Sequence, residues 1–430
     1  MQERLLQFIW RRQYFNHRQL YTAGGEELHI LFPGTLNTHQ GPDFLHARIR
    51  IGETRWAGHI ELHIRNSDWD RHAHQQDPLY RNVILHVVWE DDIAGRDPSV
   101  AERGPIPLLV LQHRVSKLFL GWYREWMDSR SFIACERQLA GVGKEIWEGW
   151  KRQLLEERLR RQALRIEGFL GQNRLHWEEA CWWLIARNFG IPVNGDAFEA
   201  IARSLPLSLL ARHSGRIDQL EALLMGQAGL LETEPPDEYG RHLQGEFRHL
   251  RGKYRLQACY HPVLFLRMRP ASMPTVRLAQ LAGLLTRSQS WFSRVLEAQH
   301  PGELRPLLEV RTSTYWDDHY ILAVASVQKL KKPGIAMVDS LLINSFVPLL
   351  YAYGRYYRDP SAREKAFRWL EGTGAEKNAQ VAGWGRLGVK SKNAADTQAL
   401  LELKRHYCDP KRCLDCAIGN ELLAPGKGPE

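Results

Sequence analysis

The fold is decided by residues 41–64, which read GPDFLHARIRIGETRWAGHIELHI. Apolar and polar residues alternate over residues 47–51 and again over residues 58–64. Alternation with period two predicts half-buried strands, so this stretch predicts two of them. If the two strands pair as a hairpin, Asp43 lies beside Glu61, and two carboxylates meet at one edge of a sheet.

Further elements are predicted on both sides of this pair. Apolar and branched residues predict three more strands, at residues 27–32, 83–89 and 108–112. The run at 83–89 is almost wholly apolar, which favours a central strand covered on both faces. Helical spacing of apolar residues predicts an N-terminal helix, and Ser67 precedes a second, short helix as its N-cap. The predicted order is therefore α-β-β-β-α-β-β.

The length of 430 residues suggests about three domains. The predicted strands lie in residues 1–115, whereas residues 116–300 and 301–430 are helical in pattern. The expected fold class is α+β, with an N-terminal α/β domain followed by a large, mostly α-helical region. Hydrophobic residues make up 44% and charged residues 25%, which excludes a disordered chain, a collagen and a disulfide-rich miniprotein.

The net charge of +9 permits a polyanionic partner without proving one. Positive residues gather at residues 151–165, 329–332 and 390–392, where they either neutralise phosphates or form a solvated face. No stretch approaches the length of an apolar membrane span, and the N-terminus lacks the apolar core of a signal peptide. We therefore expect no membrane segment. The grouped cysteines favour a reducing compartment, so we expect a cytoplasmic location.

Asp43 and Glu61 are the candidate catalytic and metal-binding carboxylates. Carboxylate oxygens are the ligands that Mg²⁺ and Mn²⁺ prefer, and such an ion orients a phosphate and lowers the pKa of a water. His63 lies two residues after Glu61, so it shares the same face of its strand. There are plainer interpretations, in which Asp43 caps a turn and Glu61 faces solvent beside a cross-strand arginine.

This pattern resembles the PD-(D/E)xK, or restriction-endonuclease-like, nuclease superfamily. The resemblance is carried by the order α-β-β-β-α-β, by Pro42-Asp43 before one strand and by Glu61-x-His63 in the next. It covers about residues 1–115 and implies a nuclease-like α/β domain in which Asp43 and Glu61 hold one or two divalent metals. His63 then stands in place of the motif's lysine, and this departure bears on turnover because histidine holds a positive charge less reliably at pH 7.

The whole chain also resembles a family of uncharacterised bacterial proteins, a domain of unknown function. This second resemblance implies no activity. The segments that carry it lie at residues 41–44, 67–69, 83–88, 221–224, 226–229 and 407–419.

Three functions follow as hypotheses. The first is a metal-dependent nucleic-acid phosphodiesterase, a nuclease acting on DNA or RNA, in which His63 orients or deprotonates the attacking water. The second is a non-catalytic nucleic-acid-binding protein with a decayed nuclease site, which the histidine at the lysine position supports. The third is a Zn or Fe enzyme acting on a small molecule, because His59, Glu61 and His63 alternate and so face one side of their strand.

Six residues are candidate contacts to nucleic acid. His72 and His74 follow the short predicted helix, and because residues i and i+2 share no helix face, both reach one site only if their segment is a loop. The plainer interpretation is a surface helix with solvated histidines. We interpret His86, inside an apolar strand, as a core residue. The six candidates are Trp69, His72, His74, Arg267, Arg269 and Arg277.

The most specific motif in the chain is Cys408-x4-Cys413-x2-Cys416. Three thiolates this close together can surround one metal, with a structural role as the expectation. Zinc would need a fourth ligand, for which His406 is the nearest candidate, whereas a [4Fe–4S] cluster would take Cys135. The spacing slightly favours the cluster. The alternative is that all three cysteines are unliganded thiols.

Overall fold

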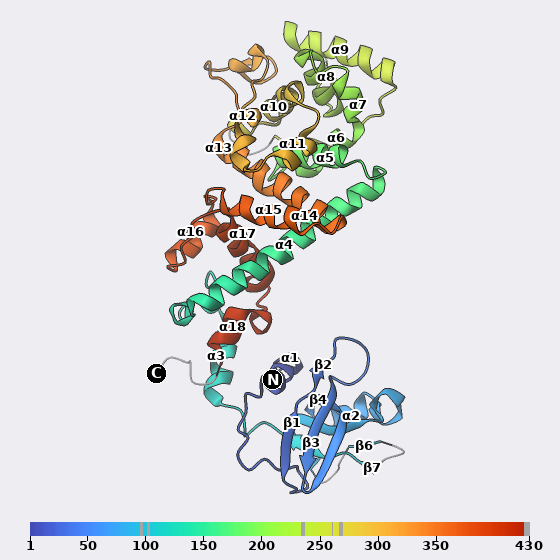
Figure 1. Ribbon diagram of the computed structural model, residues 1–430, viewed down its shortest axis with the longest axis vertical. Coiled ribbons are helices and arrows are strands. Elements are labelled where there is room, and N and C mark those ends of the chain that lie inside the picture. Colours follow the sequence, from blue (N-terminus) through green and yellow to red (C-terminus); the bar gives the residue numbers. More distant parts are fainter. Residues whose placement is uncertain (95–97, 101–103, 234–236, 260, 266–269, 425–430) are drawn as a thin grey trace. The chain divides into compact units, whose positions relative to one another are not determined.

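The structure, a computed structural model, describes residues 1–430 except 95–97, 101–103, 234–236, 260, 266–269 and 425–430 (Figure 1). About 54% of the chain is helix and 12% is strand, with a sheet near the N-terminus and a large helical region. This confirms the predicted α+β class. The chain forms two compact units, of which unit 1 comprises Met1–Trp150 with Lys404–Glu430 and unit 2 comprises Lys151–Leu403.

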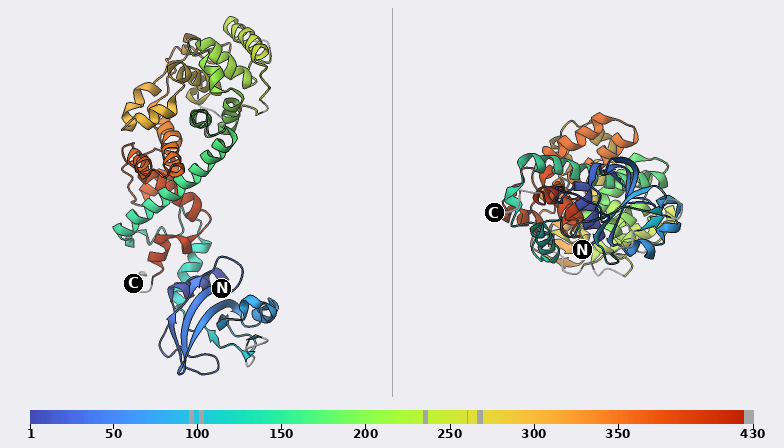
Figure 2. Two further views of the ribbon diagram at one scale, coloured as in Figure 1. Left: turned by 45° about the vertical axis from the view of Figure 1, so that its right-hand side comes forward. Right: turned by 90° about the horizontal axis from the view of Figure 1, so that it is seen from below.

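Unit 1 is built around a six-stranded sheet with the order β1-β3-β4-β5-β8, and the short β2 also pairs with β3. Its strands lie in one layer, shown from further sides in Figure 2. The strands are β1 (Leu28–Phe32), β2 (Thr35–Leu36), β3 (Phe44–Ile51), β4 (Thr54–Arg65), β5 (Val83–Glu90) and β8 (Leu108–Val110), with a separate pair of β6 (Ser99–Val100) and β7 (Gly104–Pro105). The helices are α1 (Glu3–Arg12), α2 (Asp68–Arg71), α3 (Lys117–Asp128) and α18 (Ala417–Leu422), and α4 (Lys144–Gln172) begins in this unit.

Strand direction changes across the sheet at β4. β1, β3 and β4 are antiparallel neighbours, whereas β4, β5 and β8 run parallel. Parallel neighbours need a crossover connection, and the segment between β4 and β5, which contains α2, supplies it. All five strands and both helices predicted for this region are found. The first six residues of β5 are buried, as expected for a central strand.

Helix α1 covers the sheet next to β4. Its apolar residues recur at helical spacing and form one buried face, which removes about 25 cal/mol of unfavourable hydration free energy per Å² of apolar area covered. The helix ends at Gln13, which adopts a left-handed conformation with φ of 56°. The buried face consists of Leu5, Leu6, Phe8, Ile9 and Trp10.

Unit 2 is helical apart from one small strand pair. The pair is β9 (His319–Ile321) and β10 (Val324–Ala325). The helices are the rest of α4, α5 (Trp177–Gly190), α6 (Gly195–Ser204), α7 (Leu207–Ala211), α8 (Ile217–Gln227), α9 (Glu238–Tyr254), α10 (Pro274–Arg287), α11 (Trp291–Glu297), α12 (Arg305–Leu308), α13 (Ile335–Leu341), α14 (Val347–Tyr356), α15 (Pro360–Glu371), α16 (Ala379–Arg386) and α17 (Ala394–Leu403).

The longest apolar stretch of unit 2 is Ile335–Tyr356, which joins α13 and α14 through one π-helical turn. By length and composition it could cross a membrane, a feature that the sequence analysis did not expect. However, 67% of its most apolar window is buried inside the protein. This degree of burial is typical of a core helix.

A fully buried carboxylate organises the core of unit 2. Glu221 on α8 accepts hydrogen bonds from the Tyr239 hydroxyl at 2.7 Å and the Trp316 indole at 2.9 Å, and also from the backbone and side chain of Ser313. Burial raises the pKa of Glu221, and these four donors oppose the rise. A buried acid with a full set of donors joins α8 to two other segments of the chain.

Candidate metal site

The β3–β4 hairpin brings Asp43 and Glu61 together, as predicted. Phe44 pairs with Ile60 across the two antiparallel strands, which places the preceding Asp43 opposite Glu61. The backbone N–H of Asp43 donates to Glu61 Oε2 at 3.0 Å. In return, the backbone N–H of Leu62 donates to Asp43 Oδ2 at 3.0 Å. Each carboxylate is therefore held by the strand that carries the other.

The two carboxylates lie in a poor environment for negative charge. Glu61 is only 5% exposed. Burial raises the pKa of both groups, and the charge of Asp43 raises that of Glu61 further. Within the described part of the chain, no lysine or arginine pairs with either carboxylate. A cation placed between them would reverse both effects, since it stabilises the ionised forms.

Three histidines surround the outer oxygen of Glu61. His63 Nε2 and His74 Nε2 each lie 3.5 Å from Glu61 Oε1. The Nδ1 atom of His72 lies 3.1 Å from His63 Nε2. One ring nitrogen from each of the three histidines falls within 4.8 Å of the others, a spacing that one metal ion can bridge. His63 and His74 are buried, and His72 is exposed.

The backbone at Ala73 explains how His72 and His74 reach one place. Helix α2 ends at Arg71, and Ala73 adopts a left-handed conformation with φ of 58° before a short 3-10 turn begins at His74. The segment is therefore not a continuous helix, so the objection that residues i and i+2 point apart does not apply. A left-handed alanine is strained by about 1–2 kcal/mol, and such strain concentrates at functional sites.

His86 supports His63 from the neighbouring strand. It pairs with Glu61 in the parallel β4–β5 register, and its Nε2 lies 2.8 Å from His63 Nδ1. A ring nitrogen held in this way fixes the orientation of the imidazole, as is usual for metal-binding histidines. The sequence analysis treated His86 as an ordinary core residue. Its sequence signal was only a polar residue within a wholly apolar strand.

The buried histidines are uncharged near neutral pH. Burial, followed by the neighbouring imidazoles, lowers the pKa of His63 to about 2 and that of His74 to about 4. Burial likewise lowers the pKa of His86 to about 3. A neutral imidazole has a lone pair available for a metal. His74 Nε2 is buried and makes no hydrogen bond with any described residue, so a bound ion would give it a partner.

Trp69 and Tyr80 form the wall of the site. Trp69 is 1% exposed, and its indole donates to the backbone carbonyl of Ser99 at 3.2 Å. The ring of Tyr80 stacks on His74 with 3.8 Å between centroids. The proposed stacking of a nucleic-acid base on Trp69 therefore has no exposed ring face in this structure. The tryptophan instead packs with Tyr80, Val83 and Ile106.

Comparison with known proteins identifies a family without identifying an activity. The sequence model of a family described as "Protein of unknown function (DUF2851)" matches residues 3–379. The chain belongs to the DUF2851 family. The matched range includes every residue of the histidine and carboxylate site and ends before Cys408. No curated protein matches the chain, and no solved structure does.

His59, the third member of the alternative His-Glu-His strand site, lies apart from the histidine trio of this DUF2851 protein. It is half buried, and its Nδ1 accepts a hydrogen bond from the backbone N–H of His46 at 3.3 Å. Among the described residues, the metal-sized grouping takes its histidines from His63, His72 and His74. A transition-metal site in this chain would therefore use the loop after β4 and not a single strand.

The proposed phosphate-gripping loop is only partly visible. Arg267 and Arg269 lie outside the described residues. Arg277 lies in α10, where burial lowers its pKa and its Nη1 donates to Gln280 Oε1 at 3.0 Å. A half-buried arginine that binds a side chain of its own helix is poorly placed for a phosphate.

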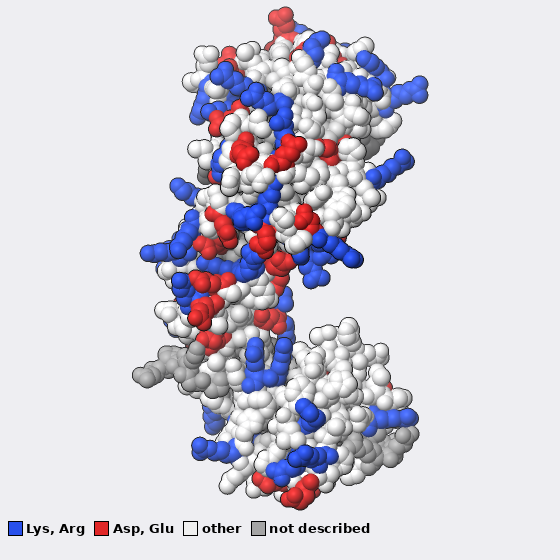
Figure 3. All heavy atoms as spheres, in the orientation of Figure 1, with Lys and Arg blue, Asp and Glu red and all other residues white. Residues whose placement is uncertain are grey.

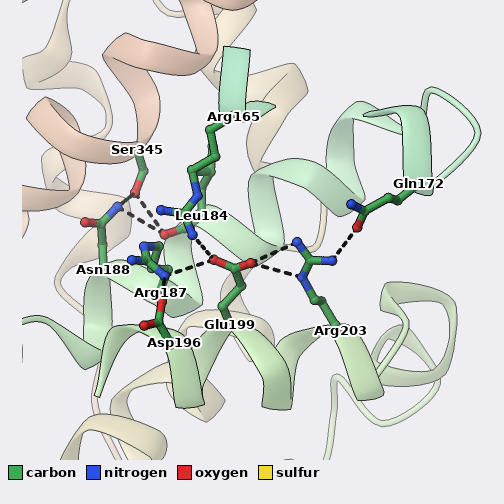
Figure 4. A network of polar contacts seen from close by, with 9 residues as sticks. All are labelled: Arg165, Gln172, Leu184, Arg187, Asn188, Asp196, Glu199, Arg203 and Ser345. Carbon is green, nitrogen blue, oxygen red and sulfur yellow. Dashed lines mark hydrogen bonds and ion pairs between the residues drawn. The ribbon is translucent and has the colours of Figure 1, made fainter. Parts of the chain in front are cut away.

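Much of the basic run on α4 is used inside unit 2. Arg165 donates to Glu199 at 2.6 Å, and Arg187 and Arg203 converge on the same carboxylate (Figure 4). The space-filling view shows acidic and basic side chains interspersed over the helical part of the protein (Figure 3). The positive charge of this helix therefore largely stabilises the fold. Further pairs join Lys151 to Asp396, Arg152 to Glu364, and Arg161 to Glu402.

The structure brings the four predicted cysteine ligands into one unit. Cys135, Cys408, Cys413 and Cys416 all belong to unit 1, although 272 residues separate the first from the second. None of the six cysteines, all of which are described, forms a disulfide. After burial, the neighbouring thiols are the next causes that raise the pKa of Cys135, to about 12. This mutual influence shows that the four thiols are neighbours.

Proposed function

We propose that this protein is a metal-dependent phosphodiesterase that cleaves DNA or RNA. The observation that carries the proposal is the convergence of two buried carboxylates, Asp43 and Glu61, with neutral imidazoles beside Glu61. This mixed set of oxygen and nitrogen donors fits a divalent cation. The nitrogen donors favour Mn²⁺ or a later transition metal over Mg²⁺, which prefers oxygen.

Each residue has a distinct task in this proposal. Glu61, His63 and His74 hold the cation, and the exposed His72 lies where the substrate would enter. Asp43 positions Glu61 through its backbone N–H and adds negative charge beside the cation. A bound divalent ion would supply positive charge for a phosphate oxygen and a water of lowered pKa. His86 keeps His63 directed at Glu61.

The sheet order supports the resemblance of residues 1–115 to restriction-endonuclease-like nucleases. Three antiparallel strands are followed by a parallel β5, which is reached through a crossover that contains a helix. This arrangement agrees with the order α-β-β-β-α-β on which the resemblance rests. Asp43 directly precedes β3, and Glu61 lies in β4, as the motif requires. We propose this fold family for the N-terminal region.

The test is cleavage by the purified full-length protein. Single- and double-stranded DNA and RNA are incubated with the protein in Mn²⁺, Mg²⁺ or EDTA. We expect cleavage in Mn²⁺ that EDTA abolishes, and a loss of about a hundredfold or more in Asp43→Ala and Glu61→Ala. Glu53→Ala, which changes an exposed acid in the turn of the same hairpin, is the matched control and should retain full activity.

Two outcomes would overturn the proposal. One is that the wild-type protein leaves all four substrates intact in every metal. The other is that Asp43→Ala cleaves as well as wild type, which would assign the activity to a contaminant. Salt-dependent binding of nucleic acid without cleavage would instead select a non-catalytic binding protein whose nuclease site has decayed.

The histidine trio favours a second candidate function, a Zn or Fe enzyme that acts on a small molecule. Three nitrogens and one carboxylate form a donor set typical of transition-metal enzymes. Stoichiometric zinc or iron that is lost in His74→Ala, together with inactivity toward nucleic acids, would select this candidate. Retention of the metal in His74→Ala would exclude it.

A further inference from the structure

The four thiols of unit 1 form a closed group that is independent of the metal site in the sheet. Cys135, Cys413 and Cys416 are each less than 10% exposed, and Cys408 is also largely buried. Cys408 is affected by all three of the other thiols, which together with burial raise its pKa. Four buried thiols that are not joined in disulfides are uncommon without a metal, because the thiolate is a metal ligand and the buried thiol is otherwise inert.

The distances between the sulfurs discriminate between zinc and a cluster. A tetrahedral zinc ion bound at about 2.3 Å would bring its sulfurs to about 3.8 Å from one another. Among the described residues, the group of three or more ligand atoms that gathers within 4.8 Å is the histidine trio, and the cysteines do not meet this limit. A four-iron cube binds each thiolate to a separate iron, so it holds the sulfurs further apart than one ion does.

The surroundings of Cys416 suit a ligand of an iron–sulfur cluster. The backbone N–H groups of Gly419 and Ile418 hydrogen-bond its sulfur and so favour the thiolate. The indole of Trp150 also faces this sulfur, but its Nε1 is buried and completes no hydrogen bond with a described residue. The inorganic sulfides of a cluster would provide acceptors for it, and hydrogen bonds of this kind tune such clusters.

The chain folds tightly around this group. A Cβ atom on Gly419 would lie 2.2 Å from the backbone oxygen of Cys413, so α18 can approach Cys413 only with glycine at this position. The ring of Tyr407 packs against Trp150 with 5.0 Å between centroids. These contacts bring the segment from Lys404 onward onto residues near Cys135 and Trp150 within unit 1.

We propose that Cys135, Cys408, Cys413 and Cys416 bind one [4Fe–4S] cluster that fastens the C-terminal segment to the N-terminal part of unit 1. Each thiol loses its proton on binding, so that four thiolates coordinate four irons. The fourth ligand is the distant Cys135 and not the nearby His406. The first 150 residues and the last segment of unit 1 are thereby cross-linked, which stabilises a contact between two ends of a long chain.

The test is the iron, acid-labile sulfide and zinc content of the full-length protein, expressed and purified without oxygen. We expect about four irons and four sulfides per chain, with the broad visible absorption of an iron–sulfur protein. Cys135→Ala should lose the sulfide and the absorption. Cys259→Ala, which changes a half-buried cysteine of unit 2, is the matched control and should retain both.

The sulfide measurement keeps this test separate from the histidine site, since iron bound there brings no sulfide. His63→Ala should therefore retain the full sulfide content. Wild-type protein that carries one zinc and no sulfide would overturn the proposal, as would wild-type protein free of metal. A Cys135→Ala variant that keeps four irons and four sulfides would also overturn the assignment of the fourth ligand. The wild-type results hold even if a variant fails to fold.

Discussion

Replacement of Glu61 by glutamine should stabilise the metal-free protein and destabilise the metal-bound one. Glu61 is buried beside Asp43, and burial together with the neighbouring charge raises its pKa far above the ordinary value of a glutamate. The folded protein therefore binds a proton that the unfolded chain releases near pH 4.5. Stability is present below that pH and falls as the pH rises toward the folded pKa.

The size of the effect follows from the same linkage. Each pH unit above the unfolded pKa costs about 1.4 kcal/mol, which gives about 3 kcal/mol between pH 4.5 and pH 7 for a fully uncompensated group. Glu61→Gln removes this cost and keeps an acceptor for the Asp43 N–H. Allowing for relaxation of the pair, we expect a gain of about 1–3 kcal/mol at pH 7 in EDTA, or about 3–10 °C in the unfolding temperature of a unit of this size.

Metal should reverse the order of the two proteins. Saturating Mn²⁺ at about a hundredfold excess over the dissociation constant stabilises the wild type by about 2.7 kcal/mol, whereas Glu61→Gln lacks the ligand and gains little. Differential scanning calorimetry in EDTA and in Mn²⁺ measures both states, with Glu53→Gln on the exposed turn of the same hairpin as the control. A Glu61→Gln variant that is less stable than wild type in EDTA would refute the reasoning.

Three further substitutions test the fold by thermal or denaturant unfolding. Ala73→Gly should raise the unfolding free energy by about 0.5–1 kcal/mol, because glycine relieves the left-handed strain at φ of 58°; an unchanged or lower value would contradict this. Gly226→Ala should cost unit 2 about 1–3 kcal/mol, because its Cβ would lie 2.2 Å from the ring of Phe247. Glu199→Gln should cost about 1–3 kcal/mol, and more at low salt, because three partly exposed arginines lose their shared carboxylate; a loss that is independent of salt would argue against repulsion.

The sheet and the meeting of Asp43 with Glu61 could be predicted because they depend on local patterns. Alternation with period two identifies the strands, and the short distance between residues 47–51 and 58–64 makes them hairpin neighbours. Once the register is set, Asp43 and Glu61 have only one place to go. The proximity of Cys135 to the C-terminal cysteines could be suspected from residue type alone, although no local pattern specifies a contact over 272 residues.

The histidine site could not be predicted because it depends on one unusual backbone angle and on one crossover. A sequence pattern gives no sign that Ala73 is left-handed, since alanine favours helix and rarely adopts positive φ. His86 reaches His63 only because β5 lies parallel to β4 in a register that pairs it with Glu61. Likewise, the basic run on α4 looked like a phosphate surface because its acidic partners, such as Glu402, lie far away in sequence.

The histidine at the motif's lysine position also takes on a different meaning in this structure. If His63 marked only the decay of a lysine, the residues around it would have no reason to suit an imidazole. Instead, His86 holds one ring nitrogen at 2.8 Å, while His72 and His74 gather near the other around Glu61. A lysine at position 63 would place a positive charge where the neutral nitrogens of a metal site converge. The substitution is therefore better explained by a change of metal ligands, from oxygens alone to oxygen and nitrogen together, than by loss of the site.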